Sequence, residues 1–200
     1  MNEKMTDRKR AAIVEAALRE FRANGFEATS MDRIAAAACV SKRTVYNHFP
    51  SKDELFEQIL VELWNCSAAL NAIAYQPGLP LRGQLLELMH QKMLLLRDPY
   101  FLDMARVAIA EAIHAPQRAQ DMVAKLGSKE EGVSVFVRAA QADGKLKAGD
   151  PQFMAMMLQG LMKSSAFWPQ VAMGQPPLDE SQQSALVTTA VDMFLGYFAA

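Results

Sequence analysis

The stretch SMDRIAAAACVSKRTVYNHFPSKDELF, residues 30–56 of this 200-residue chain, decides the fold of the region around it. Ser30 is of the residue type that caps a helix, and apolar residues follow it at helical spacing. The alanines at 35–38 have small side chains, so a second helix can cross the first at close range. Val40 fills the turn between the helices, and Ser41 caps the second one. The pattern predicts two short helices joined by a tight turn.

The second helix turns Val45 and Phe49 inward and presents a polar, cationic face outward. A short cationic helix braced by an alanine-lined neighbour is what a DNA major groove requires. A solvated polar face is the alternative interpretation. Because the turn, the caps and the register agree, we interpret this helix as a recognition helix.

Donors near the start of that helix, Lys42 and Arg43, can reach guanine O6 and N7 or nearby phosphates. Lys52 and the free amides of the helix that follows make a second anion site. Ser30 and Met31 begin the supporting helix, where its positive end meets phosphate. The predicted DNA-binding residues are Ser30, Met31, Lys42, Arg43, Thr44, Tyr46, Asn47, His48 and Lys52.

The segment from about Arg8 to Leu60 resembles the DNA-binding domain of TetR-family transcriptional regulators. The residues that carry the resemblance are Ile13, Ala17, Phe21, Gly25-Phe26, Thr29-Ser30-Met31, Ile34-Ala35, Val40-Ser41-Lys42, Thr44-Val45-Tyr46, His48-Phe49 and Ser51-Lys52-Asp53-Glu54-Leu55. Tyr46 and His48 resemble family positions that hold the DNA backbone. One position departs from the pattern, because Cys39 occupies a turn position where the family generally places Gly, which adopts positive φ without strain.

The resemblance implies an all-α protein of about nine helices in two domains. Residues 1–54 would form the DNA-binding domain, with the helix-turn-helix motif at about 30–49. Residues 55–200 would form a larger ligand-binding and dimerisation domain. The family usually represses transcription as a homodimer, which a small molecule releases from its operator.

Apolar spacing predicts helices along the rest of the chain. Thr6 is a candidate cap for the first helix, and Gly25 ends it. A long helix is expected from Ser51 to about Tyr75. The later expected helices are 81–96, 100–114, one or two helices within 116–143 with Gly127 as the uncertain point, a helix that begins after Asp150 and reaches Phe167 or Trp168, and 179–198.

The charge of the chain is unevenly distributed. Residues 1–53 hold ten Lys and Arg against seven Asp and Glu, a net charge of +3. The remainder therefore carries −4, since the whole chain carries −1. A basic end on an acidic body fits docking on nucleic acid through one end. The two cysteines lack the spacing of a disulfide framework or a metal site, and no apolar run is long enough for a membrane span. We expect a cytoplasmic protein without metal or cofactor.

Methionines and aromatic residues recur on separate helices of the C-terminal part, a composition that suits a mostly apolar pocket. Ordinary core packing is the alternative for any single methionine. Polar residues on the helix at 100–114 either orient a ligand or pair on the surface. The candidate effector-binding residues are Met89, Met93, Phe101, Met104, Arg106, Glu111, His114, Phe136, Met157 and Phe167.

The last two long helices carry more apolar residues than one buried face needs, so we expect them to pair with their copies in a second subunit. The candidate dimerisation residues are Phe153, Met156, Leu161, Leu186, Val191, Phe194 and Phe198. The sequence thus predicts a homodimeric regulator that binds double-stranded DNA and a small apolar or amphipathic effector. The alternatives are a DNA-bound architectural or cell-cycle protein without effector, and an enzyme that uses the C-terminal cavity; no catalytic constellation supports the latter.

Overall fold

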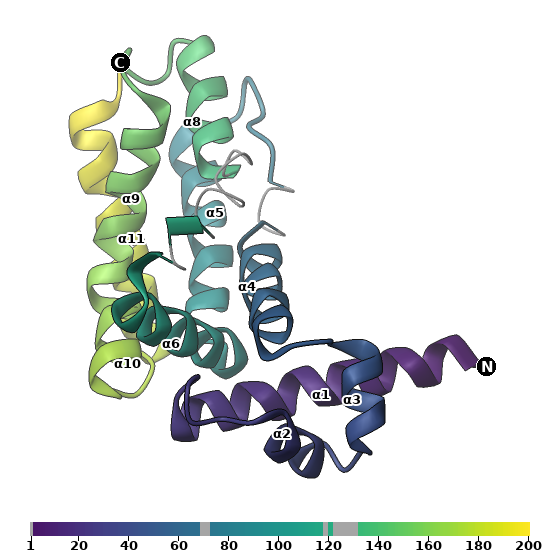
Figure 1. Cartoon of the computed structure of the whole chain (residues 1–200). Helices are drawn as coiled ribbons and strands as arrows, with labels where there is room; N and C mark the ends of the chain where they lie inside the picture. The colour runs from purple at the N-terminus through teal and green to yellow at the C-terminus, as the bar shows by residue number, and fades with distance from the viewer. Residues whose placement is uncertain (1, 69–72, 118–119, 122–131) are drawn as a thin grey trace. The chain divides into compact units, whose positions relative to one another are not determined.

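The computed structural model describes residues 2–68, 73–117, 120–121 and 132–200 (Figure 1). The described residues are helical except for connecting segments and one isolated β-bridge, between Leu146 and Ala199. The expected all-α class is confirmed. The helices are α1 Asn2–Asn24, α2 Met31–Ala37, α3 Lys42–His48, α4 Lys52–Ala68, α5 Leu81–Leu96, α6 Pro99–His114, α8 Gly132–Ala142, α9 Pro151–Ala166, α10 Trp168–Met173 and α11 Glu180–Phe198.

The chain divides into two compact units. Met1–Trp64 and Asp103–Lys125 form the first, and Asn65–Leu102 and Leu126–Ala200 form the second. The first division falls after Trp64, and the domain boundary between residues 54 and 55 stays a prediction. The structure groups most of α4 and the greater part of α6 with the N-terminal helices, so both helices belong to the two units.

In the first unit, α1 packs on α2 and α2 packs on α3. The side chains of Ile13 and Ala17 on α1, Ile34 on α2 and Val45 on α3 are completely buried. Burial of a valine or isoleucine side chain stabilises by about 1.5–3 kcal/mol. Phe21, Phe26 and Phe56 make an aromatic cluster, with ring centroids 5.2–6.3 Å apart. This cluster joins the end of α1 and the loop after it to α4.

The caps of the two short helices are those the sequence indicates. The Ser30 side chain accepts a hydrogen bond from the Arg33 amide, and the Ser41 side chain accepts one from the Thr44 amide. Each cap satisfies a helix-end amide that has no partner within the helix. The turn between the caps contains Cys39 at φ 53°, in the left-handed region. The Cys39 amide donates to the Ala36 carbonyl at 3.1 Å, so the turn is closed and hydrogen-bonded.

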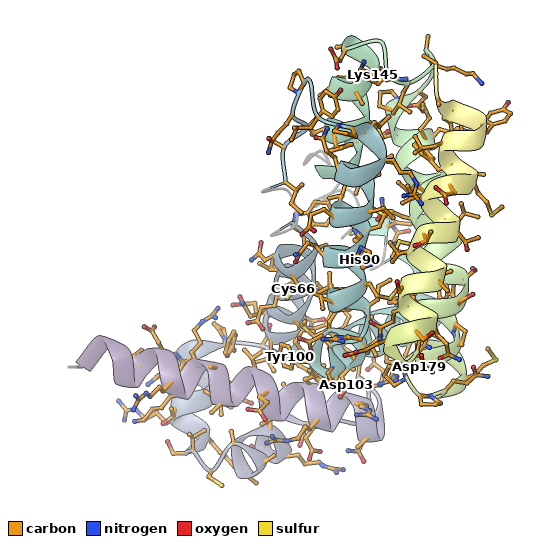
Figure 2. All side chains as sticks on the ribbon, turned by 180° about the vertical axis from the view of Figure 1, so that it is seen from behind. Cys66, His90, Tyr100, Asp103, Lys145 and Asp179 are labelled. Carbon is orange, nitrogen blue, oxygen red and sulfur yellow. The ribbon has the colours of Figure 1, made fainter. Side chains whose placement is uncertain are left out.

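The second unit is a bundle in which α11 packs against α5 and α9, and α9 also packs against α8 and α10 (Figure 1). Asp179 begins α11 with a reciprocal capping box to Gln182. Near the end of the chain, the Ala200 amide donates to the carbonyl of Lys145, which Figure 2 labels. Together with the β-bridge, this bond fixes the C-terminus to the loop between α8 and α9.

The segment before α5 is anchored on α8 of the same unit. The Tyr75 hydroxyl donates to the Asp143 carboxylate, and the Tyr75 ring packs edge-on against Phe136 at 5.4 Å between centroids. The hydrogen bond to Asp143 raises the pKa of Tyr75 to about 12.

Three expectations about helix ends differ from the structure. The first helix already includes Asn2, because Glu3, Lys4 and Met5 before Thr6 are good helix formers. The described part of α4 is Lys52–Ala68, and Tyr75 is not helical. Here the side chain of Gln84 bonds both the amide and the carbonyl of Gln76, replacing helical partners. Gly127 lies outside the described residues.

The third difference is that α10 follows α9 as a separate helix. Pro169 has no amide hydrogen to donate and therefore interrupts the helical ladder. Pro169 then takes its place in the first turn of α10, where a missing amide costs nothing. Gly174, at φ 65°, ends that helix. The sequence predicted the interruption but not the restart.

We expect Cys39→Gly to raise the free energy of unfolding by about 0.5–1 kcal/mol, because glycine adopts positive φ without the steric cost of a Cβ atom. The measurement is urea denaturation followed by circular dichroism. Cys39→Ala keeps the Cβ atom and is the matched control. An equal gain from both substitutions would show that the thiol, rather than the backbone, is responsible.

Candidate nucleic-acid interface

The outer face of α3 is polar and accessible. Lys42, Arg43, Tyr46 and Asn47 are exposed, while Thr44 and His48 are half-buried. The opposite face contributes Val45 to the core, and the C-cap Phe49 is also buried. The helix is therefore held by one apolar edge, and its cationic edge is open to a ligand.

The two cations at the start of α3 have different surroundings. Lys42 Nζ lies 2.6 Å from Asp32 Oδ2 of α2. Arg43 makes no hydrogen bond or ion pair within the described part of the chain. A guanidinium with all its donors available matches the acceptors of a guanine edge or a phosphate. Of the predicted DNA-binding cations, Arg43 is thus the one whose donors are all available.

Lys52, predicted as a phosphate ligand, holds the first unit together. Its ammonium donates to the carbonyls of Phe26 at 2.6 Å and Glu27 at 3.2 Å, and it lies 4.3 Å from the centroid of the Phe26 ring. These contacts attach the start of α4 to the loop after α1. Since a lysine has three donors and the carbonyls take two, contact with DNA stays a prediction for this residue.

Three more predicted residues also have internal roles. The hydroxyl of Ser30 serves as the cap of α2, and the hydroxyl of Thr44 is 2.8 Å from that of Ser41. The side chain of Met31 is buried in the core, so only its backbone can face a phosphate. The nine predicted residues lie at the start of α2, along α3 and at the start of α4. For Met31 a contact through the side chain is excluded by burial.

Arg10 is a residue that the sequence interpretation missed. Its guanidinium donates to Gln58 Oε1 at 2.8 Å and lies 4.8 Å from the centroid of the Phe49 ring. Arg10 therefore connects α1 to α4 and to the end of α3. The neighbouring basic residues Arg8 and Lys9 are exposed, and the sequence offers no signal that separates Arg10 from them.

The candidate effector-binding residues fall into both units. In the second unit, five of them are buried: Met89, Met93, Phe101, Phe136 and Phe167. Met157 of the same unit is exposed and so does not line its core. In the first unit, Met104 and Glu111 are buried, His114 is exposed, and Arg106 is paired with Asp103 at 2.6 Å.

A surface hollow of about 340 Å³ lies in the second unit, where the segment before α5 meets the start of that helix. Its lining residues are Ile73, Ala74, Gln76, Leu79, Pro80, Gly83, Gln84 and Glu87. None of the candidate effector-binding residues lines it. The backbone amide and carbonyl of Gln76 are both hydrogen-bonded to the side chain of Gln84. These polar groups of the hollow are therefore already paired.

The candidate dimerisation residues also separate into two groups. Phe153 and Met156 on α9 are exposed, and Leu161, Leu186 and Phe198 are half-buried. Val191 and Phe194 are buried within their own unit, which removes them from the reach of a partner. On α9 and α11 the exposed large apolar residues that the prediction omitted are Met157, Met193 and Tyr197.

Taken together, these geometries define a helix-turn-helix protein with a helical C-terminal body. A family model described as bacterial regulatory proteins of the tetR family matches residues 13–59. A second, described as the C-terminal domain of AefR-like transcriptional repressors, matches residues 83–200, more than half of the chain. The chain belongs to the TetR family. It is a DNA-binding transcriptional regulator and not an enzyme.

Individual relatives agree with this assignment. The uncharacterised HTH-type transcriptional regulator YhgD of Bacillus subtilis (strain 168) is 30% identical over 90% of this chain and 93% of its own. A solved TetR-family regulator from Pseudomonas syringae pv. tomato str. DC3000 is 52% identical, with a TM-score of 0.85, over 96% of this chain and 98% of its own. The flavonoid-responsive regulator FrrA is 25% identical, with a TM-score of 0.71, over 96% and 98%. Within the described residues, no helix combines the length and apolarity needed to span a membrane.

We expect the double substitution Lys42→Ala and Arg43→Ala to weaken binding to an operator duplex by at least about 30-fold, since each good base contact contributes roughly 1–3 kcal/mol. Gel-shift titration measures the affinity, and circular dichroism checks that helicity is unchanged. The matched control is Arg97→Ala with Lys145→Ala, which removes two exposed cations from the second unit. Equal affinity of the two double variants would refute the assignment.

Proposed function

We propose that this protein is a homodimeric repressor of transcription that a small apolar or amphipathic effector releases from its operator. The observation that carries the proposal is the surface of α3. Arg43 is exposed there without a partner among the described residues, while Val45 on the opposite face is buried in the core. A protein of this kind works on chromosomal DNA, so we place it in the cytoplasm.

A seven-residue recognition helix reaches few base pairs, so a single head discriminates poorly. Two heads related by a two-fold axis would read two half-sites about 34–36 Å apart, one turn of B-DNA, on a pseudo-palindromic operator. Specific recognition therefore requires a dimer.

The second unit supplies a face that suits a second copy. On α9 the exposed positions Phe153, Met156, Met157 and Gly160 recur at helical spacing. On α11 the exposed residues include Ala185, Thr189, Met193, Gly196 and Tyr197, beside the exposed Asp192 that pairs with Arg82. Met156 is 62% exposed and Tyr197 is 71% exposed, and a Cβ atom added at Gly160 or Gly196 would meet nothing within 4 Å. Pairing two such faces would bury apolar side chains and form a two-fold four-helix interface.

We expect Met156→Glu to dissociate the dimer, because the interface would have to bury an unpaired carboxylate. Light scattering coupled to size-exclusion chromatography measures the mass, and operator affinity should fall with it. Met173→Glu places the same charge on an equally exposed methionine of α10 and is the matched control. A Met156→Glu variant that keeps the mass of the control contradicts the proposed interface.

An apolar effector is supported by the composition of the second unit. Its buried Met89, Met93, Phe101, Phe136 and Phe167 come from α5, α6, α8 and the junction of α9 with α10. Flexible thioethers and aromatic rings adapt readily to apolar ligands. The name of FrrA states a response to flavonoids. Flavonoids are therefore a reasonable first set of compounds for this chain.

Release from DNA would be a population shift, in which the effector binds more tightly to a state whose heads no longer match the operator. Both α4 and α6 belong to the two units, so either helix can transmit a change. Asp103 of α6, labelled in Figure 2, accepts hydrogen bonds at 2.6 Å from Arg22 of α1 and from Arg106. A displacement of α6 would therefore also displace α1, through the bond between Asp103 and Arg22.

We expect Met93→Trp to abolish induction while sparing operator binding, because an indole in the buried position of Met93 would occupy the effector's space. A promoter-reporter strain titrated with flavonoids and other amphipathic compounds measures induction. Met93→Leu conserves volume and should remain inducible. Full induction of the Met93→Trp variant would place the effector elsewhere, and no response of the wild type to any compound would count against the effector.

A further inference from the structure

A carboxylate lies within the candidate DNA-binding surface. Asp32 follows the first residue of α2, and its Oδ2 lies 2.6 Å from Nζ of Lys42, the first residue of α3. The side chains remain 54% and 66% exposed, respectively, so the pair is accessible to solvent and to a ligand. The pair joins the two helices of the motif across ten residues of chain.

The next residue provides the contrast. Arg43 is exposed on the same helix and has no hydrogen bond or ion pair within the described residues. Two adjacent cations therefore approach DNA in different states. The charge of Lys42 is already offset by an acid, and that of Arg43 is not.

This difference affects the two modes of DNA binding unequally. Non-specific binding comes almost entirely from cations that neutralise phosphates and release counterions. A lysine whose charge is compensated contributes less to that mode. Specific binding depends instead on side chains held in register with base edges. A lysine held by a neighbouring carboxylate loses less freedom when it docks at one defined position.

We infer that Asp32 is a positioning residue for sequence discrimination: it holds Lys42 and weakens attachment to non-operator DNA more than attachment to the operator. This inference rests on the proposed function of the α3 surface. Arg43 then supplies the direct contact, and Lys42 acts only where Asp32 places it. The acid thus widens the gap between the two affinities without touching a base.

The test is Asp32→Asn, measured by fluorescence anisotropy on two duplexes of equal length across a series of salt concentrations. One duplex carries the operator selected from a random double-stranded library, and the other a scrambled version of it. We expect non-operator affinity at low salt to rise by about 3- to 10-fold and operator affinity to change less than about 2-fold. The slope of log affinity against log salt for the non-operator duplex should steepen by about 0.9, the value for one more phosphate contact.

Glu15→Gln is the matched control. Glu15 pairs with Arg19 at 2.7 Å, is similarly exposed and lies within α1, so its replacement makes the same change in net charge outside the motif. An Asp32→Asn variant that behaves like Glu15→Gln overturns the inference. Asp32→Ser provides the same test if the asparagine variant has lost helicity.

A double-mutant cycle separates positioning from simple repulsion of phosphate. In a Lys42→Ala background, Asp32→Asn should no longer alter the slope or the ratio of the two affinities. A full effect without Lys42 overturns the inference, because the acid would then act on DNA directly. If the wild type binds neither duplex in a salt-dependent way, the proposed function itself fails, which distinguishes that outcome from failure of the Asp32 inference alone.

Discussion

The packing of two seven-residue helices against α1 is the constraint on which the rest depends. Helices of this length do not persist in water alone, because nucleation is costly and few internal hydrogen bonds compensate for it. Here α2 and α3 are held by serine caps and by the complete burial of Ile34 and Val45. This packing leaves Arg43, Tyr46 and Asn47 exposed on the outer face of α3. The exposed polar side chains of such a surface can be exchanged without loss of the fold, and with them the DNA sequence that the surface would recognise.

The cations of the first unit divide by role rather than by position in the sequence. Arg10 and Lys52 bind internal acceptors and rings, and they stabilise the contacts among α1, α3 and α4. Lys42 is paired with Asp32 but remains exposed to solvent, and Arg43 is exposed with its donors available to a ligand. The net charge of the N-terminal part therefore overstates the charge that can act on a phosphate. What matters for recognition is which cations remain uncompensated at the surface.

In the second unit, too, buried residues that hold the fold together can be distinguished from exposed residues on the same helix. Buried Val187, Val191 and Phe194 join α11 to the bundle, while Met193 and Tyr197 remain open on another side of the same helix. An apolar stripe of this kind on each of two neighbouring helices is typical of an association surface. Both α4 and α6 contribute residues to each of the two units.

Local chemistry in the sequence was enough to predict the all-α class, the two short helices with their caps, the bounds of α5, and the Asp150 and Asp179 starts of later helices. These features depend on neighbours a few residues away, so spacing and residue type define them. Tertiary structure decided the rest. It buried Met31, committed Lys52 to backbone carbonyls, placed Asp32 against Lys42, and chose which apolar residues of α11 face the core. Such choices depend on groups brought together from distant parts of the chain, and a one-dimensional pattern contains no distance between them.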